Sequence, residues 1–120
     1  MNYKRYKNKI GYCDNKNLKG LEHIQGGHYV YIRNVDLNSN KCDVNVITSL
    51  ENDKHIYDLQ KLKQVKKGNI YVIPRYDGNF TRWSGVNTTV IRNVDATKIL
   101  DLNKKRIKRR HHFMLGKIIK

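Results

Sequence analysis

One stretch of the sequence decides the fold class: residues 28–33, which read His-Tyr-Val-Tyr-Ile-Arg. Aromatic and β-branched side chains of this kind favour an extended strand. Residues 34–40 follow with Asn, Ser and Asp, which are typical of a turn. Residues 42–48 then alternate apolar and polar side chains with the period of a strand. These segments predict an antiparallel hairpin that begins after the glycine pair at positions 26–27.

Two further β-prone runs follow the hairpin, at residues 69–73 and 87–94. Pro74, the only proline of the chain, ends the first of these runs or places it at a sheet edge. Residues 75–85 lie between the two runs and carry an Asp-Gly turn signal among basic and aromatic side chains, which indicates a loop or an irregular hairpin. We therefore expect a mainly β, barrel-like domain.

One or two short helices are expected beside the strands. Leu59, Leu62 and Val65 recur every three residues among lysines, which indicates a helical turn or a basic loop. A short helix is also expected over residues 96–102, with Asp95 as its N-cap.

Both ends of the chain are basic. Residues 1–26 show no sustained apolar period and predict an N-terminal arm, which leaves a single domain over residues 27–120. Near the C-terminus, the basic run at residues 104–110 precedes an apolar end. We expect this apolar end to pack on the barrel as a strand or helix, so that the basic run is held at the surface.

The charge of the chain narrows its function. Twenty-five Lys and Arg residues against ten Asp and Glu give a net charge of +15 on 120 residues. Such an excess repels itself in a compact fold and is neutralised by a polyanion, most simply nucleic-acid phosphate. Solubility and attraction to a membrane surface are the alternatives. No apolar run approaches the ~20 residues of a membrane span and no signal peptide is recognisable, so we expect a cytoplasmic protein with no membrane partner.

The sequence lacks the motifs of several kinds of nucleotide-binding and metal site. The sequence contains no glycine-rich phosphate loop, no HExxH motif and no Cys/His zinc pattern. Cys13 and Cys42 lack CxxC spacing and are expected to be reduced thiols without a chemical role. No pair of carboxylates can be nominated for a metal ion, so neither a cofactor nor a metal is expected. Cleavage of RNA without metal needs a base, a cation and an acid, which Arg, His, Lys, Ser and Thr can supply.

Three segments carry a resemblance to a known family: a glycine-led strand at residues 27–32, a strand ending in Ile-Thr-Ser at residues 47–49, and a late run at residues 89–99. Their order resembles that of PemK/MazF-type toxin endoribonucleases, which place a GDIV-like strand, an ITS-ending strand and an IRTID-K-RI element on an SH3-like barrel. The resemblance covers roughly residues 27–100. It implies an SH3-like β-barrel and a metal-independent endoribonuclease acting on single-stranded RNA, dimeric and held silent by an antitoxin.

The resemblance also nominates catalytic residues. The family's active-site Thr or Ser at the end of the central strand maps onto Thr48, with Ser49 beside it. The family's arginine, in a loop before an RPVLII-like strand, has no counterpart in the first hairpin. Arg33, Arg75 and Arg82 are the candidates to replace it from other loops. A strand end or a helix N-cap is the structural alternative for Thr48 and Ser49.

A second interpretation is binding of nucleic acid without cleavage, and a third is a basic face that meets an acidic protein. RNA is favoured over duplex DNA because no recognition helix long enough for a major groove is visible, whereas aromatic side chains offer stacking surfaces. Trp83 either stacks an unpaired base or lies in the core beneath a loop. The expected nucleic-acid contacts are Arg75, Tyr76, Phe80, Trp83, Lys104, Lys105, Arg106, Lys108, Arg109, Arg110 and His111.

Overall fold

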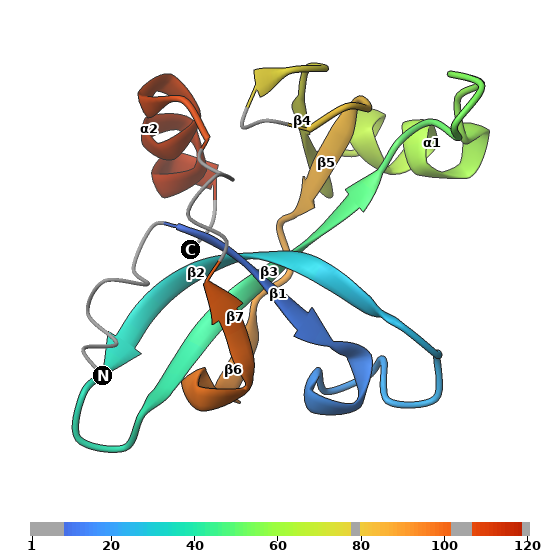
Figure 1. Cartoon of the computed structure of the whole chain (residues 1–120). Helices are drawn as coiled ribbons and strands as arrows, with labels where there is room; N and C mark the ends of the chain where they lie inside the picture. Colours follow the sequence, from blue (N-terminus) through green and yellow to red (C-terminus); the bar gives the residue numbers. More distant parts are fainter. Residues whose placement is uncertain (1–8, 78–79, 102–106, 119–120) are drawn as a thin grey trace.

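Seven strands form one antiparallel sheet in the computed structural model, which describes residues 9–77, 80–101 and 107–118 (Figure 1). The prediction of a mainly β fold is confirmed. Along the sheet the order is β4-β5-β3-β2-β1-β7, and β6 pairs with β3 at the end that β5 leaves free. The strands are β1 (Ile10–Asp14), β2 (Gly27–Asp36), β3 (Lys41–Ser49), β4 (Ile70–Ile73), β5 (Ser84–Asn87), β6 (Ile91–Asp95) and β7 (Ile99–Asp101).

The expected β2–β3 hairpin is the centre of the sheet and is covered on both faces. Its register pairs Tyr29 with Ile47 and Val30 with Val46. Because successive strand residues point to opposite faces, Val30 enters one apolar cluster and Tyr31 enters the other. The first cluster lies among β1, β2, β3, β6 and β7, and the second lies beneath β4, β5 and the C-terminal helix.

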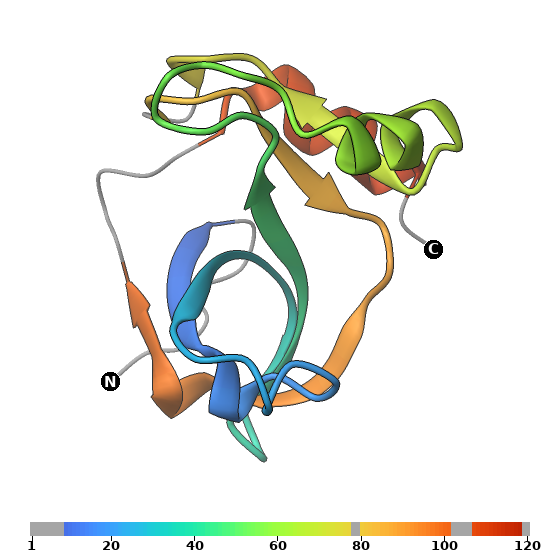
Figure 2. The same cartoon turned by 90° about the vertical axis from the view of Figure 1, so that its right-hand side faces the viewer.

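The strands curl around the first cluster without closing into a barrel (Figure 2). β6 pairs with β3 and β7 pairs with β1, but within the described residues no ladder joins β6 to β7. The 3-10 helix η4 (Ala96–Lys98) links them, and Asp95 caps it by accepting the Thr97 N–H at 2.9 Å. The strands therefore form a curled, open sheet and not the closed SH3-like barrel that the sequence predicted. The helix expected over residues 96–102 is shorter than predicted, because β7 pairs with β1 from Ile99 onward.

Within the segment expected to form an N-terminal arm, residues 10–14 form β1, which lies inside the sheet between β2 and β7. Ile10 and Cys13 are fully buried. Gly11 weakens the strand pattern in the sequence, yet it allows the close approach of β7. A Cβ atom there would lie 2.4 Å from Ile99 Cγ2 and 2.8 Å from the Leu100 carbonyl oxygen. Residues 1–8 lie outside the described residues.

Two helices lie beside the sheet. α1 (Leu59–Lys66) begins at Asp58, whose carboxylate accepts the Gln60 and Lys61 N–H groups. α2 (Arg109–Ile118) packs on the second cluster through the fully buried Leu115, so the apolar C-terminal end packs on the sheet as expected. Among the described helices, none has the length and apolar character needed to cross a membrane.

Candidate nucleic-acid interface at the end of β3

Thr48 and Ser49 end strand β3, where it pairs with β5 opposite Gly85 and Ser84. Both side chains are half-buried. Within the described ranges, neither hydroxyl has a hydrogen-bond partner. The partner strand β5 packs closely here, since a Cβ atom at Gly85 would lie 2.2 Å from Ile70 Cγ2 of β4 and 3.2 Å from Leu50 Cδ2. The structure therefore presents two unpaired hydroxyls at the end of a strand that is paired with β5.

Three hollows meet at these two residues. The Arg82 hollow, of about 200 Å³, is lined by Thr48, Ser49 and Arg82 among others. The Glu51 hollow, of about 420 Å³, is lined in part by Ser49, Lys61 and Arg82. The His28 hollow, of about 390 Å³, includes His28, Thr48 and Lys61 in its walls. The two larger volumes fall within the ~300–1,000 Å³ of typical small-molecule sites.

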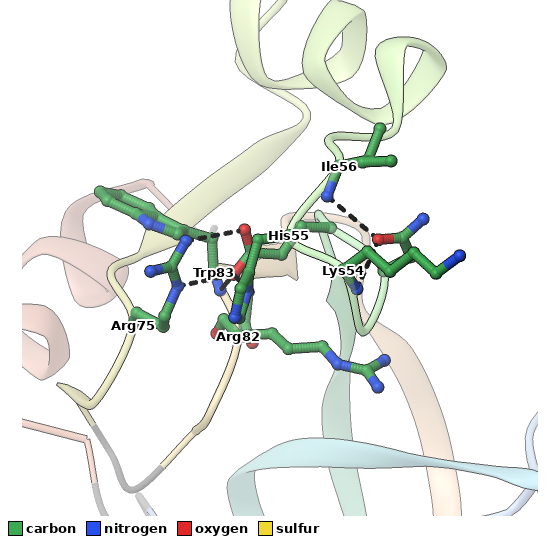
Figure 3. A network of polar contacts seen from close by, with 9 residues as sticks. Lys54, His55, Ile56, Arg75, Arg82 and Trp83 are labelled. Carbon is green, nitrogen blue, oxygen red and sulfur yellow. Dashed lines mark hydrogen bonds and ion pairs between the residues drawn. The ribbon is translucent and has the colours of Figure 1, made fainter.

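Two cations border the strand end. Arg82 is half-buried, and in the described part of the chain its guanidinium takes part in no ion pair. Figure 3 shows this guanidinium extending away from the neighbouring polar cluster. Lys61 of α1 donates from Nζ to the Ser49 carbonyl oxygen at 2.9 Å, which holds its ammonium beside the hydroxyls. Arg82 was predicted from the sequence, but Lys61 was not, because nothing in the sequence distinguishes Lys61 from the other lysines of α1.

The buried carboxylate of Glu51 organises the loop that carries Arg82 (Figure 3). It accepts two hydrogen bonds from the Arg75 guanidinium, from Nε at 2.8 Å and from Nη2 at 3.1 Å. It also accepts a hydrogen bond from the Trp83 backbone N–H at 2.8 Å and lies 3.1 Å from His55 Nδ1. The hydrogen bonds from Arg75 lower the pKa of Glu51 to about 2, and the Trp83 N–H adds to this effect while burial opposes it. Arg75 therefore anchors the loop, and its charge is neutralised.

A second carboxylate, Asp77, ties the C-terminal segment to the sheet. It contacts Lys108 Nζ at 2.9 Å, Arg110 Nη2 at 2.8 Å and His111 Nε2 at 2.9 Å. The hydrogen bond from His111, followed by that from Lys108, holds the pKa of Asp77 far below its usual range. The Lys108 and Arg110 side chains stay mostly exposed, and two cations on one carboxylate leave a positive excess there.

His111, an expected nucleic-acid contact, is buried. It is 4% exposed, and its Nδ1 lies 2.8 Å from the Tyr71 hydroxyl while its Nε2 contacts Asp77. Phe80, a second expected contact, is 5% exposed and packs edge-on against Tyr29 at a centroid distance of 5.6 Å. Phe80 belongs to the second apolar cluster, and local sequence alone does not reveal that either side chain is buried.

Arg33, one of the three candidate arginines, lies away from Thr48. It lies on β2 opposite Asp43, five residues along β3 from Thr48, which corresponds to roughly 16 Å. Tyr76 is 75% exposed, Trp83 is half-buried, and Arg109 is exposed at the start of α2. The predicted contacts Lys104, Lys105 and Arg106 lie outside the described residues.

Comparison with known proteins gives no match: neither a family model, nor a curated protein, nor a solved structure is similar to the chain. Among the described residues, no group of three His, Cys, Asp or Glu side chains is placed to hold a metal ion. The side chains that the structure brings to this site include hydroxyls, cations and an imidazole.

Proposed function

We propose that this protein binds single-stranded RNA at the end of β3 and cleaves it without a metal ion. Thr48 and Ser49 would lie near the scissile phosphate, and Arg82 and Lys61 would balance its charge. The observation that carries this proposal is the junction of three hollows at two unpaired hydroxyls, with one cation on either side.

The charge balance of the site supports a phosphate ligand. Phosphodiester cleavage passes through a state with additional negative charge on the phosphoryl oxygens, and fixed cations stabilise that state more than they stabilise the substrate. Lys61 is fixed by its bond to the Ser49 carbonyl oxygen, and Arg82 is free of carboxylates among the described residues. Arg75, by contrast, is neutralised by Glu51 and contributes to the site only through the loop it anchors.

The shape of the molecule favours unpaired RNA over duplex DNA. A recognition helix must lie free in a major groove, but α2 packs on the sheet through Leu115 and α1 has only eight residues. Hollows around the end of a strand instead admit single nucleotides whose bases are splayed out. This is also the substrate class implied by the resemblance to PemK/MazF-type toxins.

The test is incubation of the purified protein with a long single-stranded RNA in EDTA. Discrete fragments are expected from the wild-type chain. Thr48→Ala and Arg82→Gln should each abolish or strongly slow fragment formation. Thr97→Ala and Arg92→Gln, which change the same residue types at the far end of the sheet, should cleave like the wild-type. RNA that stays intact with the wild-type chain would refute the proposed cleavage.

Binding without cleavage is the second candidate, and one observation favours it. Tyr76 is 75% exposed and directly precedes Asp77, where Lys108 and Arg110 leave a positive excess. An exposed ring beside cations is a surface on which an unpaired base can stack while its phosphate is held. RNA that is shifted in a gel but left intact, with binding weakened by Tyr76→Ala, would support this alternative.

The family resemblance adds two partners to the proposal: a second copy of the chain and an antitoxin. A basic face meeting some other acidic protein remains the third alternative. Light scattering on the purified chain tests the dimer, because a monomer at tens of micromolar would refute it. Absence of both RNA cleavage and RNA shift would favour an acidic protein partner over nucleic acid.

A further inference from the structure

His28 lies on the same wall of the site as Thr48. The β2–β3 register, continued one pair beyond Tyr29 and Ile47, places His28 opposite Thr48. Both residues line the His28 hollow together with Lys61. The imidazole is therefore a neighbour of the proposed phosphate position, although it comes from the opening strand, where sequence reasoning favours a packing role.

Asn15 fixes which nitrogen of His28 carries the proton. The buried Asn15 side chain donates from Nδ2 to the Ile24 carbonyl oxygen at 3.2 Å and to the Gln25 carbonyl oxygen at 3.5 Å. Its Oδ1 therefore faces His28 Nδ1, at 2.6 Å. An amide oxygen only accepts, so Nδ1 must donate. In the neutral ring the lone pair then resides on Nε2.

The surroundings of His28 keep it neutral. Burial lowers the pKa of His28, and the positive charge of Lys61 lowers it further. The titratable and charged groups around the ring are Lys61 from α1, Lys19 from the loop after η2 (Asn15–Asn17), and Cys13 opposite it on β1. In the described residues no protein group pairs with Nε2. A histidine that merely packs does not need an oriented, neutral ring facing a hollow.

We propose that His28 is the general base of this site and that Asn15 is its positioning residue. This inference rests on the proposed RNA cleavage. His28 Nε2 takes the proton of the ribose 2′-hydroxyl, and the 2′-oxygen forms a bond to phosphorus. The bond from phosphorus to the 5′-oxygen breaks, and the leaving oxygen takes a proton from solvent. The products are a 2′,3′-cyclic phosphate and a 5′-hydroxyl, and His28 later returns its proton to solvent.

The first experiment compares His28→Gln with a matched control, His23→Gln, on an exposed loop. Positioned general bases contribute about 10²–10⁴-fold, so His28→Gln should lower the cleavage rate by that factor. Its binding of the 2′-deoxy substrate, which lacks the attacking hydroxyl, should stay within about threefold, and His23→Gln should behave like the wild-type. Circular dichroism and the melting temperature verify that the variant is folded.

The second experiment tests Asn15 through the pH profile. Asn15→Asp places a carboxylate against Nδ1, which raises the pKa of His28 and moves the acidic limb of the rate profile to higher pH. Nitrogen-15 NMR of the wild-type imidazole should show the proton on Nδ1. Unchanged cleavage by His28→Gln, or a proton on Nε2, would overturn the role of His28 and leave the proposed function standing. Wild-type protein that leaves RNA intact would overturn both.

Discussion

Truncation of Leu115 tests whether the C-terminal helix is an integral part of the fold. Leu115 is fully buried and packs in the cluster that contains Ile10, Tyr31 and Ile107. Leu→Ala at such a site removes buried carbon atoms and leaves a cavity, which costs about 2–5 kcal/mol of the free energy of unfolding. For a domain of this size the melting temperature should fall by about 8–20 °C.

Urea unfolding followed by circular dichroism and by the fluorescence of Trp83, the only tryptophan, measures the loss. Phe113→Ala is the matched control, because Phe113 lies on the same helix with 64% of its surface exposed and with the Lys117 ammonium 4.4 Å from its ring centroid. Phe113→Ala should lower the free energy of unfolding by less than about 1 kcal/mol. Equal losses for the two variants, or a loss below about 1 kcal/mol for Leu115→Ala, would refute the packing of α2 on the sheet.

Three further predictions concern charge and the thiols. Because the folded pKa of Glu51 is about 2 against 4.5 for the free group, its stabilisation is present above pH 4.5 and is lost as the pH falls toward 2. The urea midpoint should drop across that window, and Glu51→Gln should flatten the drop. Burial raises the pKa of Cys13 to about 11 and that of Cys42 to about 12, so a thiol reagent at pH 8 should react only after unfolding. Arg82→Gln should reduce the slope of log affinity for RNA against log salt by about 0.7, whereas Arg92→Gln should leave it unchanged.

Much of the fold could be predicted because the β2–β3 hairpin has a strong local pattern. β-branched and aromatic residues define both strands, and polar residues define the turn. β1 could not be predicted, since it is a strand only because it pairs with β2 and β7, which lie far from it in sequence. Gly11 reads as a break in the sequence but is required where β7 passes within van der Waals distance. Closure into a barrel also depends on long-range pairing of β6 and β7, which local patterns do not determine.

The candidate site could be predicted only in part. Thr48, Ser49 and Arg82, which were all nominated from the sequence, line one hollow. Among the other nominated residues, Arg75 is ion-paired with Glu51 and His111 is buried. The composition gives the number of Lys and Arg residues but does not show which of them already have a carboxylate partner. That distinction depends on Glu51 and Asp77, whose arginine partners lie 24 and 33 residues away in sequence.

The positions of the buried polar residues indicate that the region around the end of β3 has a role beyond stability. A small domain gains stability from an apolar interior, and each buried polar group is costly unless it is hydrogen-bonded. Six polar residues are nonetheless buried in the described part of the chain, and four of them line the hollows or hold residues that do. Ser84 and Glu51 line two of the hollows directly. Asn15 orients His28, and Asn45 donates to the carbonyl oxygens of Asn87 and Thr89, two residues that line the His28 hollow. These four buried polar residues thus lie in or directly behind the walls of the hollows where we propose that RNA is cleaved.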